Sequence, residues 1–370
     1  MVVVMAVFTI VVSHAERGFA TSRIVFMADA HVGEGCNSSK TGYRLNDRNC
    51  YSVRDLRAAV ERVNEIHEQN DSVPLSLVLL GGDVTASAQE TEFIAARREL
   101  DRLSMPYLPV MGNHDVWTYI PDIGDLTPAP SADTLFASVF QTTFERFQCQ
   151  QNFSYKNVTV YNPSHMCNST FQSWSLSGSC DVLQNNKDLQ NVKVIAPDFN
   201  TRLRAPPPCP KTLPTGGCGV LGMAELFDFK NGTLDWFRKE VTDNTPQEIE
   251  TVIFLIHQPF RCRFGVPDWY FCFSKENKKV IRNIISSSPV DNKKFWGVLA
   301  GHQHRWFNGT AFDEPAFKHF RQWENSAIKG DYFDSKMSSS FTVLTFEDSN
   351  LIDLEMHWRE NGVWKKRQSA

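Results

Sequence analysis

The sequence predicts an α/β fold, because short apolar runs alternate along the chain with segments of helical periodicity. The runs are bounded by Gly or polar residues, which is typical of strands buried on both faces. We expect these strands at residues 24–27, 75–80, 106–111, 252–256 and 295–300. A polar motif follows each strand. The motifs therefore lie at the carboxyl ends of strands, where α/β folds gather their ligands.

Helices are expected between these strands. Apolar residues recur at helical spacing over Ser52–Asn70, and a capping box at Ser87-Ala88-Gln89-Glu90 predicts a second helix that ends near Leu103. Further helices are expected to begin at Thr233 and to run over Glu276–Ile285. Residues 341–346 and 351–358 alternate between apolar and polar, which predicts a hairpin that closes one sheet.

The motifs that follow the strands combine carboxylate, amide and imidazole groups, which are metal ligands. They are Asp29-Ala30-His31, Gly82-Asp83, Gly112-Asn113-His114-Asp115, His257 and Gly301-His302-Gln303-His304. Two glycines before Asp83 allow a sharp turn, and its two carboxylate oxygens can bridge two cations. Besides Asp83, the motifs offer six nitrogen or oxygen ligands, which is more than the protein usually supplies to a single metal ion. Two cations about 3.5–4 Å apart, sharing Asp83, are therefore predicted, an arrangement that suits in-line displacement at phosphorus.

These motifs, in this order, resemble the calcineurin-like metallophosphoesterase superfamily, whose pattern is D-x-H, G-D, G-N-H-[DE], a lone His after a strand, and G-H-x-H. The resemblance covers residues 22–346 and implies a sandwich of two mixed β-sheets flanked by helices (α/β/β/α). It implies a dinuclear metal-dependent phosphoesterase in which a metal-bridging hydroxide attacks phosphorus. The first metal would be held by Asp29, His31, Asp83 and His304, and the second by Asp83, Asn113, His257 and His302.

The same resemblance assigns catalytic roles to His114 and Asp115. His114 would contact the phosphate and assist the leaving oxygen, and Asp115 would orient His114 through a hydrogen bond. At two positions the sequence departs from the patterns of particular subgroups of this superfamily, which argues against membership in those subgroups. The G-D-x-x-D-R-G extension of phosphoprotein phosphatases is missing after Asp83, and Ala86 occupies the position of the tyrosine ligand of purple acid phosphatases.

The substrates implied are small phosphomonoesters, nucleotides or lipid head-group phosphodiesters. Substrate contacts are predicted for Trp117, Tyr119, Arg261 and Arg305, with ordinary loop packing as the alternative. The mixed nitrogen and oxygen ligands suit zinc, iron or manganese. Two other functions remain open: a catalytically inactive metal-binding scaffold on the same fold, and an extracellular binding protein.

Composition is that of a globular protein, with 370 residues, 42% hydrophobic residues and a net charge of −4. No Lys- or Arg-rich run marks a nucleic-acid partner, and no feature indicates an oligomeric state. We expect a single domain over residues 21–370. Residues 127–218 are expected to form a disulfide-tied insertion packed beside the metal site.

The amino terminus and the cysteines favour the secretory pathway, either secretion or a lysosome-like lumen. Residues 1–15 resemble a signal peptide and are too short to span a bilayer. Seven N-x-[ST] sequons indicate a glycoprotein. The chain has nine cysteines, an odd number. Plausible pairs are Cys36–Cys50, Cys209–Cys218, Cys262–Cys272, and Cys149 with Cys167 or Cys180. The alternative is a set of reduced cysteines in the cytosol.

Overall fold

The structure is a computed structural model of the full chain. It describes residues 21–34, 38–39, 42–43, 50–69, 73, 75–116, 132–147, 152–162, 167–178, 180, 186–200, 203–204, 220–221, 224, 226, 232–262, 272–329 and 337–368. The predicted signal peptide lies outside these residues. So do two of the predicted substrate contacts, Trp117 and Tyr119.

The first sheet has six strands in the order β17-β16-β15-β1-β4-β5. Its parallel half consists of β1 (Ser22–Met27), β4 (Leu75–Leu80) and β5 (Tyr107–Pro109). Its antiparallel half consists of β15 (Met337–Glu347), β16 (Asn350–Glu360) and β17 (Val363–Gln368). The pairing of β15 with β16 confirms the predicted C-terminal hairpin, and β15 joins it to β1.

The second sheet has seven strands in the order β13-β14-β12-β11-β8-β7-β6. Four central strands are parallel: β14 (Arg321–Glu324), β12 (Phe295–Ala300), β11 (Thr251–Ile256) and β8 (Val192–Ala196). The outer strands are antiparallel to their neighbours: β13 (Phe307–Thr310), β7 (Cys167–Ser177) and β6 (Phe153–Asn162). Both sheets are mixed, as the resemblance implied.

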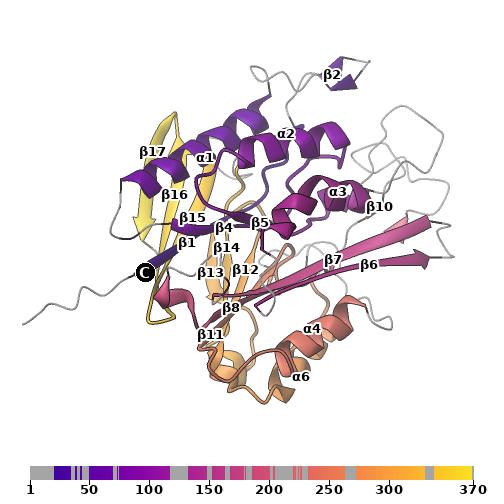
Figure 1. The fold of residues 1–370 in the computed structure, drawn as a ribbon, viewed down its shortest axis with the longest axis vertical. Coiled ribbons are helices and arrows are strands. Elements are labelled where there is room, and N and C mark those ends of the chain that lie inside the picture. The colour runs from indigo at the N-terminus through magenta and orange to yellow at the C-terminus, as the bar shows by residue number, and fades with distance from the viewer. Residues whose placement is uncertain are drawn as a thin grey trace, which may run out of the picture.

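Helices cover the outer faces of the two sheets (Figure 1). The first sheet carries α1 (Tyr51–Glu68) and α2 (Glu90–Leu100), and the second carries α4 (Thr233–Thr242) and α6 (Lys275–Ser287). Helix α3 (Ala132–Glu145) packs against β5 of the first sheet and β7 of the second. Short 3₁₀ turns lie at His114–Val116, Lys187–Leu189, Asn292–Lys294 and Pro315–Phe317. Two-stranded pairs form between β2 (Ser38–Ser39) and β3 (Gly42–Tyr43), and between β9 (Leu203–Arg204) and β10 (Val220–Leu221).

Strand β11 shows how the layers are packed. Ile253 and Leu255 belong to the large core that also contains residues of β1, β4 and α1. Phe254 and Ile256 belong to a second core with residues of α4 and α6. Alternate side chains of a strand point to opposite faces, so β11 is apolar on both sides. This is why the sequence shows a continuous apolar run there.

Helix α2 begins later than predicted. Its capping box consists of Gln89 and Glu92, whereas the predicted one consisted of Ser87 and Glu90. The buried Glu92 carboxylate accepts hydrogen bonds from the backbone N–H and the hydroxyl of Ser87. Ala88 has a φ of 55°, so the chain turns between Ser87 and the helix.

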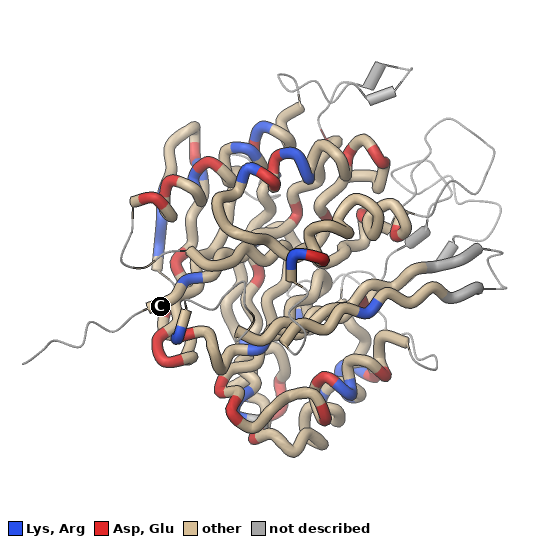
Figure 2. The backbone as a smooth tube through the Cα atoms, viewed as in Figure 1, with Lys and Arg blue, Asp and Glu red and all other residues tan. Residues whose placement is uncertain are grey.

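The stretch predicted as an insertion contributes to the second sheet. Its described residues include α3 and the strands β6, β7 and β8, and β8 pairs in parallel with β11. The expected boundaries of the insertion and the single-domain organisation stay predictions. Over the outer helices, basic and acidic residues are interspersed in the part of the chain that the structure describes (Figure 2).

Candidate metal centre

The loops that follow β1 and β4 continue the parallel pairing of those strands. The backbone N–H of Asp29 donates to the Gly82 carbonyl at 3.0 Å, and that of His31 donates to the Asp83 carbonyl at 2.9 Å. A further bond, 2.9 Å long, joins the N–H of Val32 to the Val84 carbonyl. These bonds place the D-x-H motif directly beside the Gly-Asp motif.

Five side chains of the motifs stand on strained backbone. Positive φ angles occur at Asp29 (57°), His31 (44°), Asp83 (50°), His302 (72°) and His304 (51°). The left-handed conformation costs a non-Gly residue about 1–2 kcal/mol. Such strain persists where the surroundings hold the residue in place, and it gathers at functional sites.

Two glycines let these loops approach closely. Gly82 has a φ of 88°, as the predicted sharp turn requires, and a Cβ there would lie 2.7 Å from His257 Nδ1. A Cβ on Gly112 would lie 2.1 Å from Asp83 Oδ1. Each glycine therefore makes room for a side chain of the centre.

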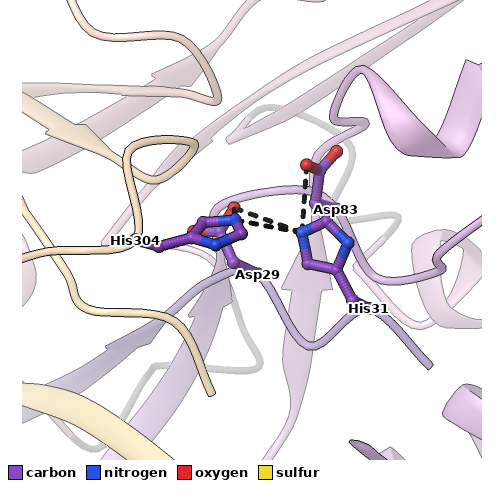
Figure 3. Close-up of side chains that lie close together, drawn as sticks. All are labelled: Asp29, His31, Asp83 and His304. Atoms are coloured by element: carbon purple, nitrogen blue, oxygen red, sulfur yellow. Dashed lines mark hydrogen bonds and ion pairs between the residues drawn. The ribbon is translucent and has the colours of Figure 1, made fainter. Parts of the chain in front are cut away.

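The first group of possible ligands consists of Asp29, His31, Asp83 and His304, all buried (Figure 3). His31 Nε2 lies 3.1 Å from His304 Nε2 and 3.3 Å from Asp83 Oδ2. His304 Nε2 lies 3.4 Å from Asp29 Oδ1. The four side chains come from β1, β4 and β12, so the group joins the two sheets.

The second group consists of Asp83, His257 and His302, with Asn113 beside it. His257 Nε2 lies 3.2 Å from Asp83 Oδ2, 2.9 Å from Asn113 Oδ1 and 3.1 Å from His302 Nδ1. Its other ring nitrogen donates to the Gly81 carbonyl at 2.8 Å. Because a carbonyl can only accept, this bond places a proton on Nδ1, and Nε2 is the ring nitrogen that faces the other ligand atoms.

Both groups fit a bound cation. Two ligand atoms at about 2.1 Å from one ion, at angles of about 90–110°, lie about 3.0–3.4 Å apart. The distances around His31 and His257 mostly fall in this range. In addition, His257 Nε2 faces the acceptor oxygens of Asn113 and Asp83. Acceptors that face one another at such distances need a proton or a cation between them.

Comparison with known proteins places the chain in a family. The calcineurin-like phosphoesterase model matches residues 22–306, a span that holds all five motifs. The chain belongs to the calcineurin-like phosphoesterase family. No curated protein matches the sequence.

Two solved structures are similar to this chain at low sequence identity. A dimetal phosphatase from Danio rerio superposes with a TM-score of 0.52 at 13% identity, covering 94% of this chain and 99% of that one. A purple acid phosphatase from seeds of yellow lupin (Lupinus luteus) has a TM-score of 0.47 at 13% identity, covering 94% and 53%. The first of these likenesses shows the α/β sandwich.

Charge coupling within the centre is strong. Burial would raise the pKa of Asp83, but the charges of His257 and His114 and the hydrogen bonds of His257 and His31 hold it well below its usual range. Burial would lower the pKa of His257, but Asp83 outweighs it and raises that pKa to about 9. Burial lowers the pKa of His31 and His302. Without a cation, Asp83 is thus an ionised carboxylate beside a protonated His257.

His114 lies at the edge of the centre, with its ring centroid 4.5 Å from that of His31. Its Nδ1 donates to the Ala86 carbonyl at 2.7 Å, and its backbone N–H donates to Asp83 Oδ1 at 2.8 Å. Burial lowers the pKa of His114. The ring orientation is therefore held by the Ala86 carbonyl.

Asp115 does not orient His114, so that predicted hydrogen bond is wrong. The Asp115 carboxylate instead accepts bonds from the backbone N–H groups of Val84, Thr85 and Gly112 and from the Thr85 hydroxyl, at 2.8–3.1 Å. Burial raises its pKa to about 7. Asp115 thus joins the loop after β4 to the loop after β5, and it supports Asp83 and Asn113 through the backbone.

Two of the predicted substrate contacts, Arg261 and Arg305, lie among the described residues, and their surroundings differ. The Arg261 guanidinium pairs with Asp313 at 2.9 Å and donates to the Thr310 hydroxyl at 2.9 Å, at the β13 end of the second sheet. Arg305 is buried and donates to the Gln303 side chain within the G-H-Q-H motif. Arg305 is therefore the one that lies beside the ligand residues.

Sequence reasoning missed Asn200, which follows β8. Its side-chain amide donates to the Met111 carbonyl at 2.8 Å, and its Oδ1 accepts a bond from Gln258 at 2.6 Å. Asn200 thus connects the loops that carry Asn113 and His257. A weak signal was present in the sequence, since Asn200 lies in the loop that follows the run Val192–Ala196, with three residues between them.

The disulfide predicted between Cys262 and Cys272 is present, and Cys50 and Cys180 are also disulfide-bonded. The Gln303 amide donates to the sulfur of Cys262 at 2.7 Å. The disulfide therefore contacts the residue between His302 and His304. Among the helices that the structure describes, none has both the length and the apolar character needed to cross a bilayer.

Proposed function

We propose that this chain is a dinuclear metal-dependent phosphoester hydrolase that acts on small phosphomonoesters, nucleotides or lipid head-group phosphodiesters. One observation carries the proposal. Asp83 Oδ2 lies 3.3 Å from His31 Nε2 and 3.2 Å from His257 Nε2, so one carboxylate joins two groups of ligands. Family membership supplies the class of reaction.

Each ligand group would hold one cation. The first would be held by Asp29, His31, Asp83 and His304, and the second by Asp83, Asn113, His257 and His302. Zinc, iron and manganese all suit such nitrogen and oxygen donors. Bound there, two cations would supply a nucleophile from water and neutralise charge on the phosphoryl oxygens.

The protein's own contribution is to hold acceptors and donors in place. Asp29 accepts the backbone N–H of His302 with both oxygens, at 2.9 and 3.0 Å, which aligns ligands from the two sheets. With its Nδ1–H on the Ala86 carbonyl, His114 would need a second proton, on Nε2, to donate to a phosphoryl oxygen or to protonate the leaving oxygen. It would therefore act as an imidazolium, a form that the negative charge of a bound phosphate would favour. Asp115 would position the loops of Asp83 and Asn113.

We also propose that the protein acts in the secretory pathway. The disulfide between Cys262 and Cys272, with Cys50 and Cys180 also disulfide-bonded, supports an oxidising compartment. The leader-like segment at residues 1–15 and the seven sequons agree with this. Proteolytic trimming of residues 1–15 and a mobility shift after glycosidase treatment of the secreted protein are the expected results.

The hydrolase proposal is tested by measuring metal content and turnover on the same purified sample. We expect about two metal ions per chain, with hydrolysis of p-nitrophenyl phosphate, of bis(p-nitrophenyl) phosphate, or of both. A protein that binds metal but hydrolyses neither ester, nor nucleotides or head-group esters, would instead be an inactive metal-binding scaffold. A protein that binds no metal would favour an extracellular binding role.

A further inference from the structure

Strand β6 forms one edge of the second sheet. It is the last strand in the sheet order, and in the part of the chain that the structure describes it pairs with β7 alone. The two strands run as a long ribbon between α3 and α4 (Figure 1). An edge strand presents unpaired backbone N–H and C=O groups, to which a strand of another chain can pair. Proteins protect such edges by keeping them short or by placing Pro or charged residues on them.

The other three edges of the two sheets are protected in these ways. Strand β5 has three residues and ends at Pro109, and β13 has four residues. Strand β17 carries Lys365, Lys366 and Arg367 in succession. Strand β6 differs from all three, because it has ten residues, six of them β-branched or aromatic, with no Pro and a single charge at Lys156. A strand of this composition is prone to pair with another copy of itself.

A glycosylation sequon lies within β6, at Asn157-Val158-Thr159. The side chains of Asn157 and Thr159 are two positions apart on a strand, so they share one face, and both residues are exposed. Helix α3 covers this face at Tyr155, whose ring stacks on that of Phe144 with centroids 4.6 Å apart. Beyond Tyr155, a group attached to the Asn157 amide would therefore extend into solvent beside the edge.

The position of Asn157 distinguishes it from the other sequons. The structure describes the Asn side chain of three of the seven, Asn152, Asn157 and Asn308. Asn152 is half-buried and precedes β6. Asn308 is exposed on the short edge strand β13, where its side-chain oxygen accepts a hydrogen bond from Arg321 at 2.5 Å. Asn157 is thus the exposed sequon residue on the long edge that lacks other protection.

On the basis of the proposed location in the secretory pathway, we propose that Asn157 is a glycosylation site whose glycan keeps β6 from pairing with a second copy of this chain. The donor is a lipid-linked diphosphate oligosaccharide. The Asn157 amide nitrogen forms a bond to the anomeric carbon of the oligosaccharide, and the bond from that carbon to the diphosphate breaks. The lipid diphosphate leaves with the electron pair and takes up the proton that the amide loses. The attached glycan is bulky and hydrophilic, so it blocks the approach of another strand.

The first test maps the glycans of the wild-type chain after secretion from a eukaryotic host. Peptide N-glycosidase F converts a glycosylated Asn to Asp, which mass spectrometry of the peptides detects, and we expect this conversion at Asn157. Asn157→Gln and Thr159→Ala should each lose one glycan, seen as a shift in electrophoretic mobility. Thr159→Ser keeps the sequon and should keep the glycan. The mapping of the wild type does not depend on the folding of any variant.

The second test measures self-association by sedimentation velocity at micromolar protein concentration. Asn157→Gln and Thr159→Ala should form dimers or larger species that the glycosylated wild type does not form. Asn157→Lys also lacks the glycan but places a charge on the edge, so it should sediment as the wild type does. Asn308→Gln removes the sequon from the short edge β13 and should also match the wild type. Hydrolysis of p-nitrophenyl esters by the monomeric fraction should be the same for all these variants.

An unmodified Asn157 in a secreted chain that is glycosylated elsewhere would overturn the site. The protective role would be overturned if Asn157→Gln sediments as the wild type does, or if Asn157→Lys or Asn308→Gln self-associates as strongly as Asn157→Gln. A chain that never enters the secretory pathway would contradict the proposed compartment and the site together. A secreted chain with a glycan at Asn157 but no hydrolysis would contradict only the hydrolase proposal.

Discussion

At the scale of single residues, hydrogen bonds to the surrounding backbone determine how the polar side chains of the centre are oriented. His257 Nδ1 donates a hydrogen bond to the Gly81 carbonyl, and His114 Nδ1 donates one to the Ala86 carbonyl. The Asp115 carboxylate accepts four hydrogen bonds. These bonds fix tautomers and loop paths before any ligand binds. Residues close together in sequence can therefore have different partners, as Asn113, His114 and Asp115 do.

Substitution of Asp83, the proposed bridging carboxylate, and of His114 should separate metal binding from turnover. We expect Asp83→Asn to abolish activity through metal loss, because an amide cannot supply the shared negative charge. His302→Ala should act in the same way. His114→Asn should keep its metal and lose most activity, by about 10²–10⁴-fold. Metal analysis beside steady-state kinetics checks this, and an empty centre in His114→Asn would disprove the division of roles.

Asp115→Asn should destabilise the fold. The asparagine keeps one acceptor oxygen but turns an NH₂ group toward backbone donors, so buried hydrogen bonds are lost at a cost of about 2–4 kcal/mol. Thr85→Ala, which removes one of the four donors, should cost about 1 kcal/mol. Urea denaturation of the metal-free proteins measures both. Equal effects of the two substitutions would contradict the bracing role of Asp115.

At the scale of elements, strand ends and the loops after them determine the centre. The loops after β1 and β4 pair with one another, and the disulfide after β11 contacts Gln303 in the loop after β12. Each loop is thus attached to a second loop that carries ligands. The strain at the five positive-φ residues is maintained by these attachments.

Removing the disulfide should weaken metal binding. We expect the double variant Cys262→Ala, Cys272→Ala to bind metal about 10–100-fold more weakly, because Gln303 loses its sulfur contacts and the loop of His302 and His304 is less constrained. Metal titration of the reconstituted variant measures this. If thermal stability falls while metal affinity stays at the wild-type value, the disulfide supports only the fold.

Helices α1 and α2 are joined by Glu99, which accepts bonds from Arg57 and Arg102 at 2.8–2.9 Å. Burial would raise the pKa of Glu99, but the arginines outweigh it and lower that pKa to about 2. The folded-state pKa is thus below the unfolded value, so this stabilisation is complete above about pH 4.5 and is lost as the pH falls toward 2.

Glu99→Gln should therefore lower the free energy of unfolding by about 1–2 kcal/mol at pH 7, a value that allows for solvent screening of the arginines. The difference from the wild type should shrink as the pH falls from 4.5 to 2. Denaturation of metal-free protein at several pH values checks this. A difference that stays constant with pH would show that the carboxylate charge is not responsible.

At the scale of the whole molecule, the centre lies where the carboxyl ends of strands from two sheets meet. Asp29, His31, Asp83 and Asn113 follow strands of the first sheet, and His257, His302 and His304 follow strands of the second. Bound cations would therefore connect the sheets. Ligands that bind only the folded state stabilise it by mass action.

Much of this arrangement could be predicted from the sequence, because each proposed ligand residue lies in the loop that follows an apolar strand, and both the strand and the motif are visible locally in the sequence. The partners of Asp115 could not, since they depend on the path of the loop after β4, about 30 residues away along the chain. The backbone hydrogen bond from Lys329 to the Asp29 carbonyl could not be predicted either. The proximity of Lys329 to Asp29 arises because the chain returns to β1 after β14, and only the tertiary structure shows that return.

The most direct test of the shared carboxylate is a calorimetric titration of metal-free protein with Zn²⁺ or Mn²⁺, with thermal stability followed at each step. We predict two equivalents per chain in the wild type, a rise in unfolding temperature as they bind, and neither effect in Asp83→Asn. A single equivalent in the wild type, or two retained by Asp83→Asn, would contradict a centre in which Asp83 joins two cations.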